Sequence, residues 1–307
     1  MTNTATKTVL ILGASGKIGI NAARAFLADG WTMRRFNRAT DDMTKAAMGA
    51  DVIVNGLNPP NYHNWVKLIP AITKQVITAA KASGATVIIP GNVYHFGNVG
   101  GEWSETTPPA PCARKGQIRL DMERAYRASG VQTIILRAGD FIDPDRNGDV
   151  LSTVLLPRIK SDRIIAPGPT ELLHSYAYLP DWANAAVRLA NKRGDLSGFE
   201  DIPFPGHSFT LSELRSELET ILNRNVSFSR FPWGLLRLAS PFWELARELR
   251  EMRYLWETPH TLSSRRFDEL LPDFPATPLG DVLRSALPEH INPNQPMSAG
   301  PASKLMA

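Results

Sequence analysis

Short runs of apolar, often β-branched residues recur along the first half of the chain and predict the strands of a buried sheet. The segment TVLIL is apolar on both faces, which is typical of a strand covered on both sides in a parallel sheet. The expected strands are residues 8–12, 31–38, 50–57, 85–91 and 132–141. Apolar residues recur at helical spacing between them, in residues 17–30, 63–84 and 115–130. Strands that alternate with helices predict an α/β fold with a doubly wound parallel sheet.

Beyond residue 150 the pattern loosens and predicts a smaller, mostly helical lobe. A short strand leads into a helix that Asp181 is expected to cap, and a later helix follows an N-cap at Thr210 or Ser212. Residues 240–257 form a strongly amphipathic segment. Its apolar face consists of Phe242, Leu245, Leu249, Met252 and Trp256. Interleaved glutamates argue against a membrane-surface role for this segment, so we expect its apolar face to pack in the core.

The composition narrows the class of protein. The chain has 307 residues, of which 43% are hydrophobic and 21% charged, as in ordinary globular proteins. The net charge of +4 is spread along the chain without a Lys/Arg block, so we expect no nucleic-acid partner. The single Cys112 and the dispersed histidines predict neither a disulfide framework nor a metal site. Because no signal-peptide pattern or membrane-spanning apolar stretch is found, we expect a cytoplasmic protein with no membrane partner.

The stretch GASGKIG, residues 13–19, connects the first predicted strand to the first predicted helix. In a Rossmann-type fold Gly13 permits the turn, Gly16 lets a pyrophosphate approach the backbone, and Gly19 lets the helix pack closely on the strand. The free N–H groups and the dipole of the helix N-terminus favour an anion at this point. We therefore predict a dinucleotide site. Its contacts in this turn are expected to include Ser15, Lys17 and Ile18.

The second predicted strand ends at Asn37 and Arg38, near the place where NAD-binding folds put an acidic residue on the adenosine ribose. Arg38, helped by Arg34 or Arg35, offers a cation to a 2′-phosphate instead. We expect Asn37 and Arg38 to contact NADP, with NAD as the other possible cofactor.

Several segments resemble, in their order along the chain, the extended and atypical short-chain dehydrogenase/reductase superfamily. They are VLILGASGKIG, ADVIVNGL, ATVIIPGNVYHFG, IILRAGDFI and SYAYLPDWANA, and the similarity covers roughly residues 8–287. The superfamily includes NAD-dependent epimerases and dehydratases that act on sugar nucleotides. The resemblance implies a dinucleotide-binding domain at 7–150, completed by strands between 160 and 205, and a mainly substrate-binding lobe at 151–287. The Pro-, Ser- and Asn-rich residues 288–307 predict a disordered tail.

The resemblance also implies cofactor contacts at the ends of the third and fourth predicted strands. The residues concerned are Gly56, Leu57, Asn58, Pro90, Gly91 and Asn92. The chain departs from the family pattern in three ways. The family's serine falls on Pro90, its Tyr-x-x-x-Lys pair falls on Lys115 and Arg119, and the segment between Arg38 and Ala50 is too short for one further strand and helix. The usual tyrosine acid/base is therefore absent.

An isoflavone-reductase-like branch of the superfamily carries a lysine in the helix where other members have that tyrosine, and its helix is similar to KGQIRLDME here. The resemblance implies that Lys115 either transfers a proton to or from a substrate oxygen or holds the nicotinamide ribose. A surface lysine on an amphipathic helix is the third interpretation.

Four more side chains are candidates for contacts with a substrate. Tyr94 and His95 follow the fourth strand, and the Tyr94 hydroxyl either replaces the missing tyrosine or packs. Asp140 either holds a substrate hydroxyl or, as we favour, pairs with Arg137. His174 either lines the substrate lobe or packs within it.

Together these features predict an NAD(P)-dependent oxidoreductase, a monomer or homodimer, that moves a hydride to or from a carbonyl or alcohol carbon of a small substrate. Two alternatives remain open: an NAD-dependent epimerase or dehydratase acting on sugar nucleotides, and a redox sensor that binds NADP without turnover.

Overall fold

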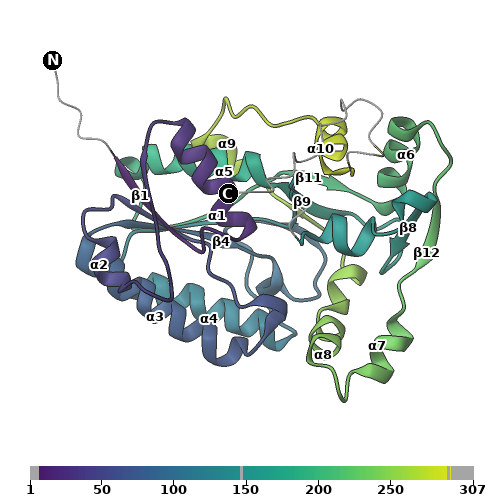
Figure 1. Cartoon of the computed structure of the whole chain (residues 1–307), viewed down its shortest axis with the longest axis horizontal. Helices are drawn as coiled ribbons and strands as arrows, with labels where there is room; N and C mark the ends of the chain where they lie inside the picture. The colour runs from purple at the N-terminus through teal and green to yellow at the C-terminus, as the bar shows by residue number, and fades with distance from the viewer. Residues whose placement is uncertain (1–6, 146–147, 289–290, 292–307) are drawn as a thin grey trace, which may run out of the picture.

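A computed structural model describes residues 7–145, 148–288 and 291 of the chain. Its centre is a six-stranded parallel sheet with the strand order β10-β6-β4-β3-β1-β2 (Figure 1). The strands are β1 Thr8–Leu12, β2 Thr32–Arg35, β3 Val52–Asn55, β4 Thr86–Gly91, β6 Thr133–Arg137 and β10 Phe199–Pro203. The chain runs from β1 to β2 on one side and then to β3 on the other. The strand order therefore reverses at β1, and the crevice at the carboxyl ends of β1 and β3 is where such sheets bind ligands.

Helices cover both faces of this sheet, which confirms the predicted doubly wound α/β class (Figure 1). One face is covered by α1 Lys17–Ala28 and α5 Leu179–Asn191. The other is covered by α2 Met43–Ala47, α3 Trp65–Ser83 and α4 Arg114–Ser129. The inner strands β1, β3 and β4 are largely apolar on both faces because each face meets a helix layer.

The second half of the chain adds a lobe with its own hydrophobic core. Its strands are β7 Asp140–Ile142, β8 Arg163–Ala166, β9 His174–Tyr178, β11 His207–Phe209 and β12 Ser227–Arg230. Its helices are α6 Leu211–Leu222, α7 Trp233–Ala239, α8 Glu244–Glu251 and α10 Leu279–Ala286. The remaining elements are the strand pair β5 Gly101–Trp103 and β13 His260–Leu262, and α9 Arg265–Leu270 beside β10. Most of the predicted tail, 288–307, lies outside the described residues.

The structure confirms one of the helix caps predicted for this half of the chain and contradicts the other. Thr210 is the N-cap of α6 and forms a capping box with Glu213, as predicted. The prediction that Asp181 caps α5 is wrong. Tyr178 is the N-cap, and the Asp181 carboxylate accepts hydrogen bonds from the Thr277 N–H and hydroxyl, both at 2.8 Å. Residues 132–141 were predicted as one strand. They instead form two strands, β6 and β7, which belong to different sheets.

Residues 240–257, predicted as one helix with a core-packed apolar face, need a partial correction. Of that face, Met252 is buried and Leu245, Leu249 and Trp256 are half-buried, as expected. The segment is divided into α8 and a 3₁₀ turn at Arg253–Glu257. Phe242 is 94% exposed, whereas Glu248 is buried. The reason is that Pro241 cannot continue the preceding helix, and α8 turns its charged face toward basic residues of α4. In the part of the chain that the structure describes, no helix is long and apolar enough to cross a membrane.

Candidate active site

The turn after β1 has the geometry that its glycines predict. Gly13 has φ +75°, and a Cβ there would lie 2.9 Å from the carbonyl oxygen of Gly56, at the end of β3. A Cβ on Gly19 would overlap the Gly13 carbonyl oxygen, so Gly19 permits the close approach of α1. A Cβ on Gly16 would meet only the Gly13 oxygen, at 3.4 Å. The side of the turn at Gly16 is therefore open to a ligand, next to the N–H groups that begin α1.

A groove of about 670 Å³ leads from this turn across the ends of β2 and β3. It is lined by Gly13, Ala14, Ser15, Gly16, Arg35, Phe36, Asn37, Arg38, Ala39, Gly56, Leu57, Asn58 and Pro60. Most of the cofactor contacts predicted around β1, β2 and β3 thus meet in one place. Ile18 does not line the groove, because its side chain packs in the core beneath α1. Its predicted contact is limited to its backbone.

Two arginines line the groove at the end of β2. Arg35 and Arg38 are exposed, and neither forms an ion pair within the described chain. Arg34 is committed elsewhere, since it donates to the Met48 carbonyl at 2.9 Å. The loop that carries Arg38 is ordered by Asp41, whose carboxylate accepts from the Asn37 N–H at 2.7 Å. Two arginines without an ion pair in the described chain therefore line the groove where an adenosine ribose would lie.

Lys17 lies on the other side of the glycine turn, toward the lobe. Its ammonium donates to the Gly148 carbonyl at 2.7 Å, and burial lowers the pKa of Lys17. Asp140 and Asp149 are the nearest of its acidic neighbours. Burial raises the pKa of Asp140 to about 6, even though Lys17 opposes the shift. Lys17 and Asp140 therefore interact electrostatically where the sheet meets the lobe, although neither is among the residues that line the groove.

The favoured pairing of Asp140 with Arg137 is wrong. Arg137 is fully buried, and its guanidinium binds Glu123 at 2.9 Å and Asp201 at 2.6 Å. Asp140 follows a bend at Gly139, where β7 leaves the sheet. The cation that acts on the Asp140 carboxylate is Lys17 instead.

His95 is drawn into the same buried network. Its Nδ1 lies 3.1 Å from the Arg137 guanidinium, and burial together with that charge lowers the pKa of His95 to about 3. The ring packs against Phe96 inside the protein, with the two planes tilted by 39°. The expectation that His95 contacts a substrate is therefore not supported.

His174 also lies away from the groove. Its ring packs against Trp256 and His260 within the lobe, and burial, with His260 beside it, lowers the pKa of His174 to about 4. Of the two interpretations of His174, packing describes this arrangement.

Tyr94 lies in the turn that follows β4. Gly91 has no room for a side chain, because a Cβ would lie 2.5 Å from Ile135, whereas Pro90 is half-buried. The Asn92 amide oxygen accepts from the Tyr94 N–H at 3.1 Å. Asn92 thus orients the turn that carries Tyr94 rather than standing free for a ligand.

Two tyrosines meet at this end of the sheet. The hydroxyls of Tyr62 and Tyr94 lie 3.1 Å apart, and burial raises the pKa of both. Tyr62 has φ +60° between Asn61 and Asn64, which also have positive φ. Such a backbone is unusual for an aromatic residue, and strain of this kind collects at functional sites. Arg119 lies near the two tyrosines. Its guanidinium donates to the Asn58 side-chain oxygen at 3.1 Å and lies 4.8 Å from the centre of the Trp65 ring.

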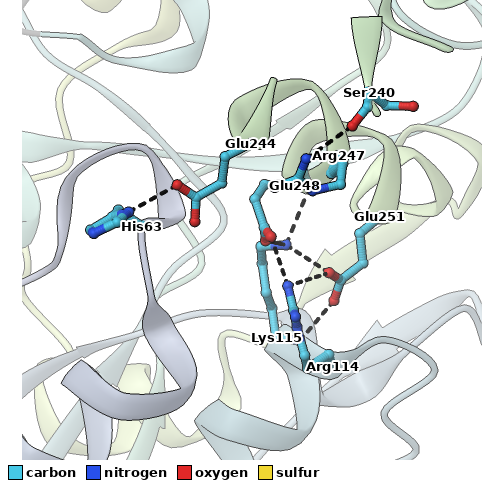
Figure 2. A network of polar contacts seen from close by, with 8 residues as sticks. All are labelled: His63, Arg114, Lys115, Ser240, Glu244, Arg247, Glu248 and Glu251. Carbon is cyan, nitrogen blue, oxygen red and sulfur yellow. Dashed lines mark hydrogen bonds and ion pairs between the residues drawn. The ribbon is translucent and has the colours of Figure 1, made fainter. Parts of the chain in front are cut away.

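Lys115 has a different environment from the one expected. Its side chain is fully buried, and its ammonium pairs with the carboxylates of Glu248 and Glu251, the latter at 2.9 Å (Figure 2). The Tyr62 ring lies 5.0 Å from the same ammonium. In this arrangement α8 covers Lys115, so the ammonium cannot touch a substrate or a nicotinamide ribose.

Glu248 and Glu251, the partners of Lys115, were not predicted from the sequence. Glu244, Glu248 and Glu251 follow one another at i, i+4 and i+7, so they share one face of α8. Figure 2 shows this face turned to His63, Arg114 and Lys115. The spacing was visible in the sequence, but only the fold shows which basic residues it meets. Among the described residues, no group of three or more His, Cys, Asp or Glu could hold a metal ion.

No protein-family model and no curated protein matches the sequence. Solved structures do match the fold. The UDP-glucuronic acid 4-epimerase of Bacillus cereus, in complex with UDP-glucuronic acid and NAD, superposes with a TM-score of 0.72 at 16% identity, over 91% of this chain and 97% of its own. MoeE5, in complex with UDP-glucose and NAD, gives a TM-score of 0.71 at 14% identity, with the same 91% and 97% covered.

A nucleoside-diphosphate-sugar epimerase from Staphylococcus aureus gives a TM-score of 0.64 at 18% identity, over 90% of this chain and 99% of its own. At these identities the likeness establishes the fold alone. It confirms the Rossmann-type sheet with an added lobe that the sequence resemblance predicted, over nearly the whole length of each relative.

Proposed function

We propose that the protein is an NADP-dependent oxidoreductase that reduces a carbonyl group of a small substrate. The observation that carries this proposal is the groove between the open side of Gly16 and the unpaired Arg35 and Arg38. A pyrophosphate fits at the helix N-terminus, and a 2′-phosphate fits at the two guanidinium groups. The known structures of similar fold that hold NAD support a nicotinamide dinucleotide in this position.

NADPH, when bound, supplies a hydride from C4 of its nicotinamide ring. The protein must then give a proton to the substrate oxygen that becomes an alcohol. We assign this role to Tyr94, because its hydroxyl lies at the carboxyl end of β4 and is hydrogen-bonded to that of Tyr62. Burial raises its pKa, so the hydroxyl carries its proton at neutral pH and needs the developing negative charge of the substrate oxygen to release it. The Tyr62 hydroxyl, 3.1 Å away, is placed to replace that proton. Lys115, which α8 covers, then has a structural role, because its ion pairs hold α8 against α4.

A redox-neutral epimerase is the second candidate. It is favoured by the sugar-nucleotide complexes of structures with the same fold. Such an enzyme returns the hydride to the same substrate, so it consumes no net cofactor, and it needs a group that removes a proton as easily as it donates one. Because burial raises the pKa of Tyr94, its hydroxyl keeps its proton at neutral pH, whereas an epimerase must first have a deprotonated group to oxidise its substrate.

Calorimetry with NADPH, followed by NADPH-oxidation assays on aldehydes, ketones and nucleoside-diphosphate sugars, tests the proposal. We expect binding and steady NADPH consumption with at least one carbonyl compound. Interconversion of two sugar nucleotides without NADPH consumption would establish the epimerase. Tight NADPH binding with no turnover of any substrate would instead support the redox sensor. Absence of dinucleotide binding would refute all three.

A further inference from the structure

The segment from α7 to α8 leaves four large apolar side chains in solvent at one end of the molecule. Leu235 is 67% exposed, Leu238 75%, Phe242 94% and Trp243 49%. The other large apolar side chains with comparable exposure in the described chain occur singly or as a pair, at Leu27, Met48, Val66, Leu68, Val99 and Leu173. Figure 1 shows α7 and α8 projecting from the body at the lower right. These four residues lie within nine positions of the chain, on α7 and in the turn that leads to α8, and we term them the apolar tip.

The acidic residues of this segment do not lie at the tip. Glu244 binds His63 at 2.9 Å, and Glu248 binds Arg114 at 2.7 Å (Figure 2). Glu251 binds Lys115 at 2.9 Å. Arg114 and Lys115 therefore neutralise Glu248 and Glu251 at the body of the protein. Glu244 also turns to the body, but its partner His63 carries a charge only when protonated.

The basic residues are arranged in the opposite way. Arg237, Arg247 and Arg250 are all exposed, and none forms an ion pair with any residue that the structure describes. Arg247 and Arg250 donate to the carbonyl and hydroxyl of Ser240, in the turn between the two helices. Three guanidinium groups that form no ion pair in the described chain are thus carried by α7 and α8, and Arg247 interacts with the Glu244 carboxylate only at longer range.

We propose that the apolar tip inserts into the surface of an anionic phospholipid bilayer, so that the protein binds membranes peripherally. Aromatic and leucine side chains with flanking arginines are the composition that places a short helical segment at the boundary of headgroups and acyl chains. Anionic lipids complement the three guanidinium charges. This location goes beyond the proposed reaction and does not depend on it.

The shape of the tip favours lipid over a protein partner. The exposed side chains project from the body, whereas a protein partner would have to offer a concave apolar surface rimmed with acidic groups. A second copy of this chain presents the same arginines, and like charges would then face each other. A bilayer surface deforms around a projecting group and carries the opposite charge.

Flotation of the full chain with vesicles tests the proposal. We expect the protein to float with vesicles of phosphatidylcholine and phosphatidylglycerol and to stay behind with phosphatidylcholine alone. The bound fraction should fall as salt is added, because salt screens the arginines. Replacing Phe242→Ser and Trp243→Ser together should lower the affinity for anionic vesicles about tenfold or more. Arg237→Glu should weaken binding as well.

Val99→Ser is the matched control, because Val99 is 62% exposed and lies outside the tip. It should bind vesicles like the unchanged protein, and circular dichroism should show all variants folded. Two results would overturn the proposal: no flotation of the unchanged protein with anionic vesicles, or equal flotation of the double variant. A dimer in light scattering that the double variant disperses, without vesicle binding, would assign the tip to contact between copies instead.

Discussion

The ammonium of Lys115 lies 2.9 Å from a carboxylate oxygen of Glu251, a residue 136 positions further along the chain. Glu251 also accepts a hydrogen bond from the Lys115 backbone N–H at 3.0 Å. Both interactions join the first turn of α4 to α8. The lobe is therefore fastened to the end of the sheet through the residue that sequence resemblance proposed as the acid/base.

Lys115→Met should destabilise the protein, because Glu248 is buried and would keep only Arg114 as its partner. Loss of one partner of a buried ion pair typically costs about 3–5 kcal/mol, and the remaining arginine should reduce the loss to about 2 kcal/mol. Urea unfolding measures the change. Lys67→Met, on an exposed residue of α3, is the control and should change little. Equal stability of the two variants would mean that α8 does not rest on Lys115 in solution.

Tyr94→Phe should lower turnover by about 10² to 10⁴ at saturating cofactor, the usual effect of removing a general acid. The ring still packs on Trp65, so the fold and the cofactor affinity should stay unchanged. Tyr62→Phe should cost less, since Tyr62 only relays the proton. Steady-state kinetics distinguish these outcomes. If folded Lys115→Met loses turnover by orders of magnitude while Tyr94→Phe retains it, Lys115 is the proton donor and α8 must move away from it.

Gly16→Val should abolish dinucleotide binding without unfolding the chain. Its Cβ would meet only the Gly13 oxygen, at 3.4 Å, yet the side chain would occupy the space of the pyrophosphate. Gly19→Val, by contrast, should unfold the protein, because its Cβ would overlap the Gly13 carbonyl oxygen. Calorimetry and circular dichroism test both variants. Undiminished binding by folded Gly16→Val would refute the assignment of the turn to the cofactor.

Arg38→Asp should reverse the preference between the two dinucleotides. A carboxylate repels a 2′-phosphate and accepts from a 2′-hydroxyl, so the ratio of NADP to NAD affinity should fall by about tenfold or more. Arg230→Asp, at an exposed and unpaired arginine outside the groove, is the control. An unchanged ratio in Arg38→Asp would show that Arg38 faces solvent when the dinucleotide is bound.

Asp140 should make stability depend on pH in a particular direction. Its pKa rises from 3.8 to about 6 on folding, so between these values the folded chain holds more protons than the unfolded chain. Its contribution to stability therefore decreases as the pH rises through this range. Asp140→Asn removes that decrease. Relative to the unchanged protein, the variant should gain roughly 2 kcal/mol between about pH 4 and pH 7.5 in urea unfolding. No gain would mean that Asp140 is solvated.

The sheet and the glycine turn were predictable because their signals are local. Alternating strands and helices fix the α/β class, and the run from Thr8 to Gly19 contains a strand, a turn and a helix start in one continuous segment. Parallel sheets also bring the carboxyl ends of their strands to one edge, so the meeting of Gly16, Arg38 and Asn58 followed from their order in the chain.

Pairing between distant charges was not predictable in the same way. The sequence places Asp140 three residues after Arg137, but Arg137 instead binds Glu123 and Asp201, which come from a helix and a strand on either side of it. Periodicity assigned the apolar side of residues 240–257 to the core, which holds for Met252 but not for Phe242. The orientation of α8 is set by its ion pairs with Arg114 and Lys115 of α4. No pattern within residues 240–257 shows where these two residues lie.

The contact between Gly13 and Gly56 limits how the protein can recover from mutation. A side chain at residue 13 would meet the carbonyl and the next amide of the Gly56 backbone, at 2.9 to 3.2 Å, and Gly56 has no side chain that could be shortened. A side chain that is too large for a core can be compensated by a smaller side chain at a neighbouring position, because the total volume of the core is then kept. Here no compensating substitution exists at the partner. A genetic selection for suppressors of Gly13→Val should return true revertants at that codon, and second-site suppressors should be confined to substitutions that stabilise the protein as a whole.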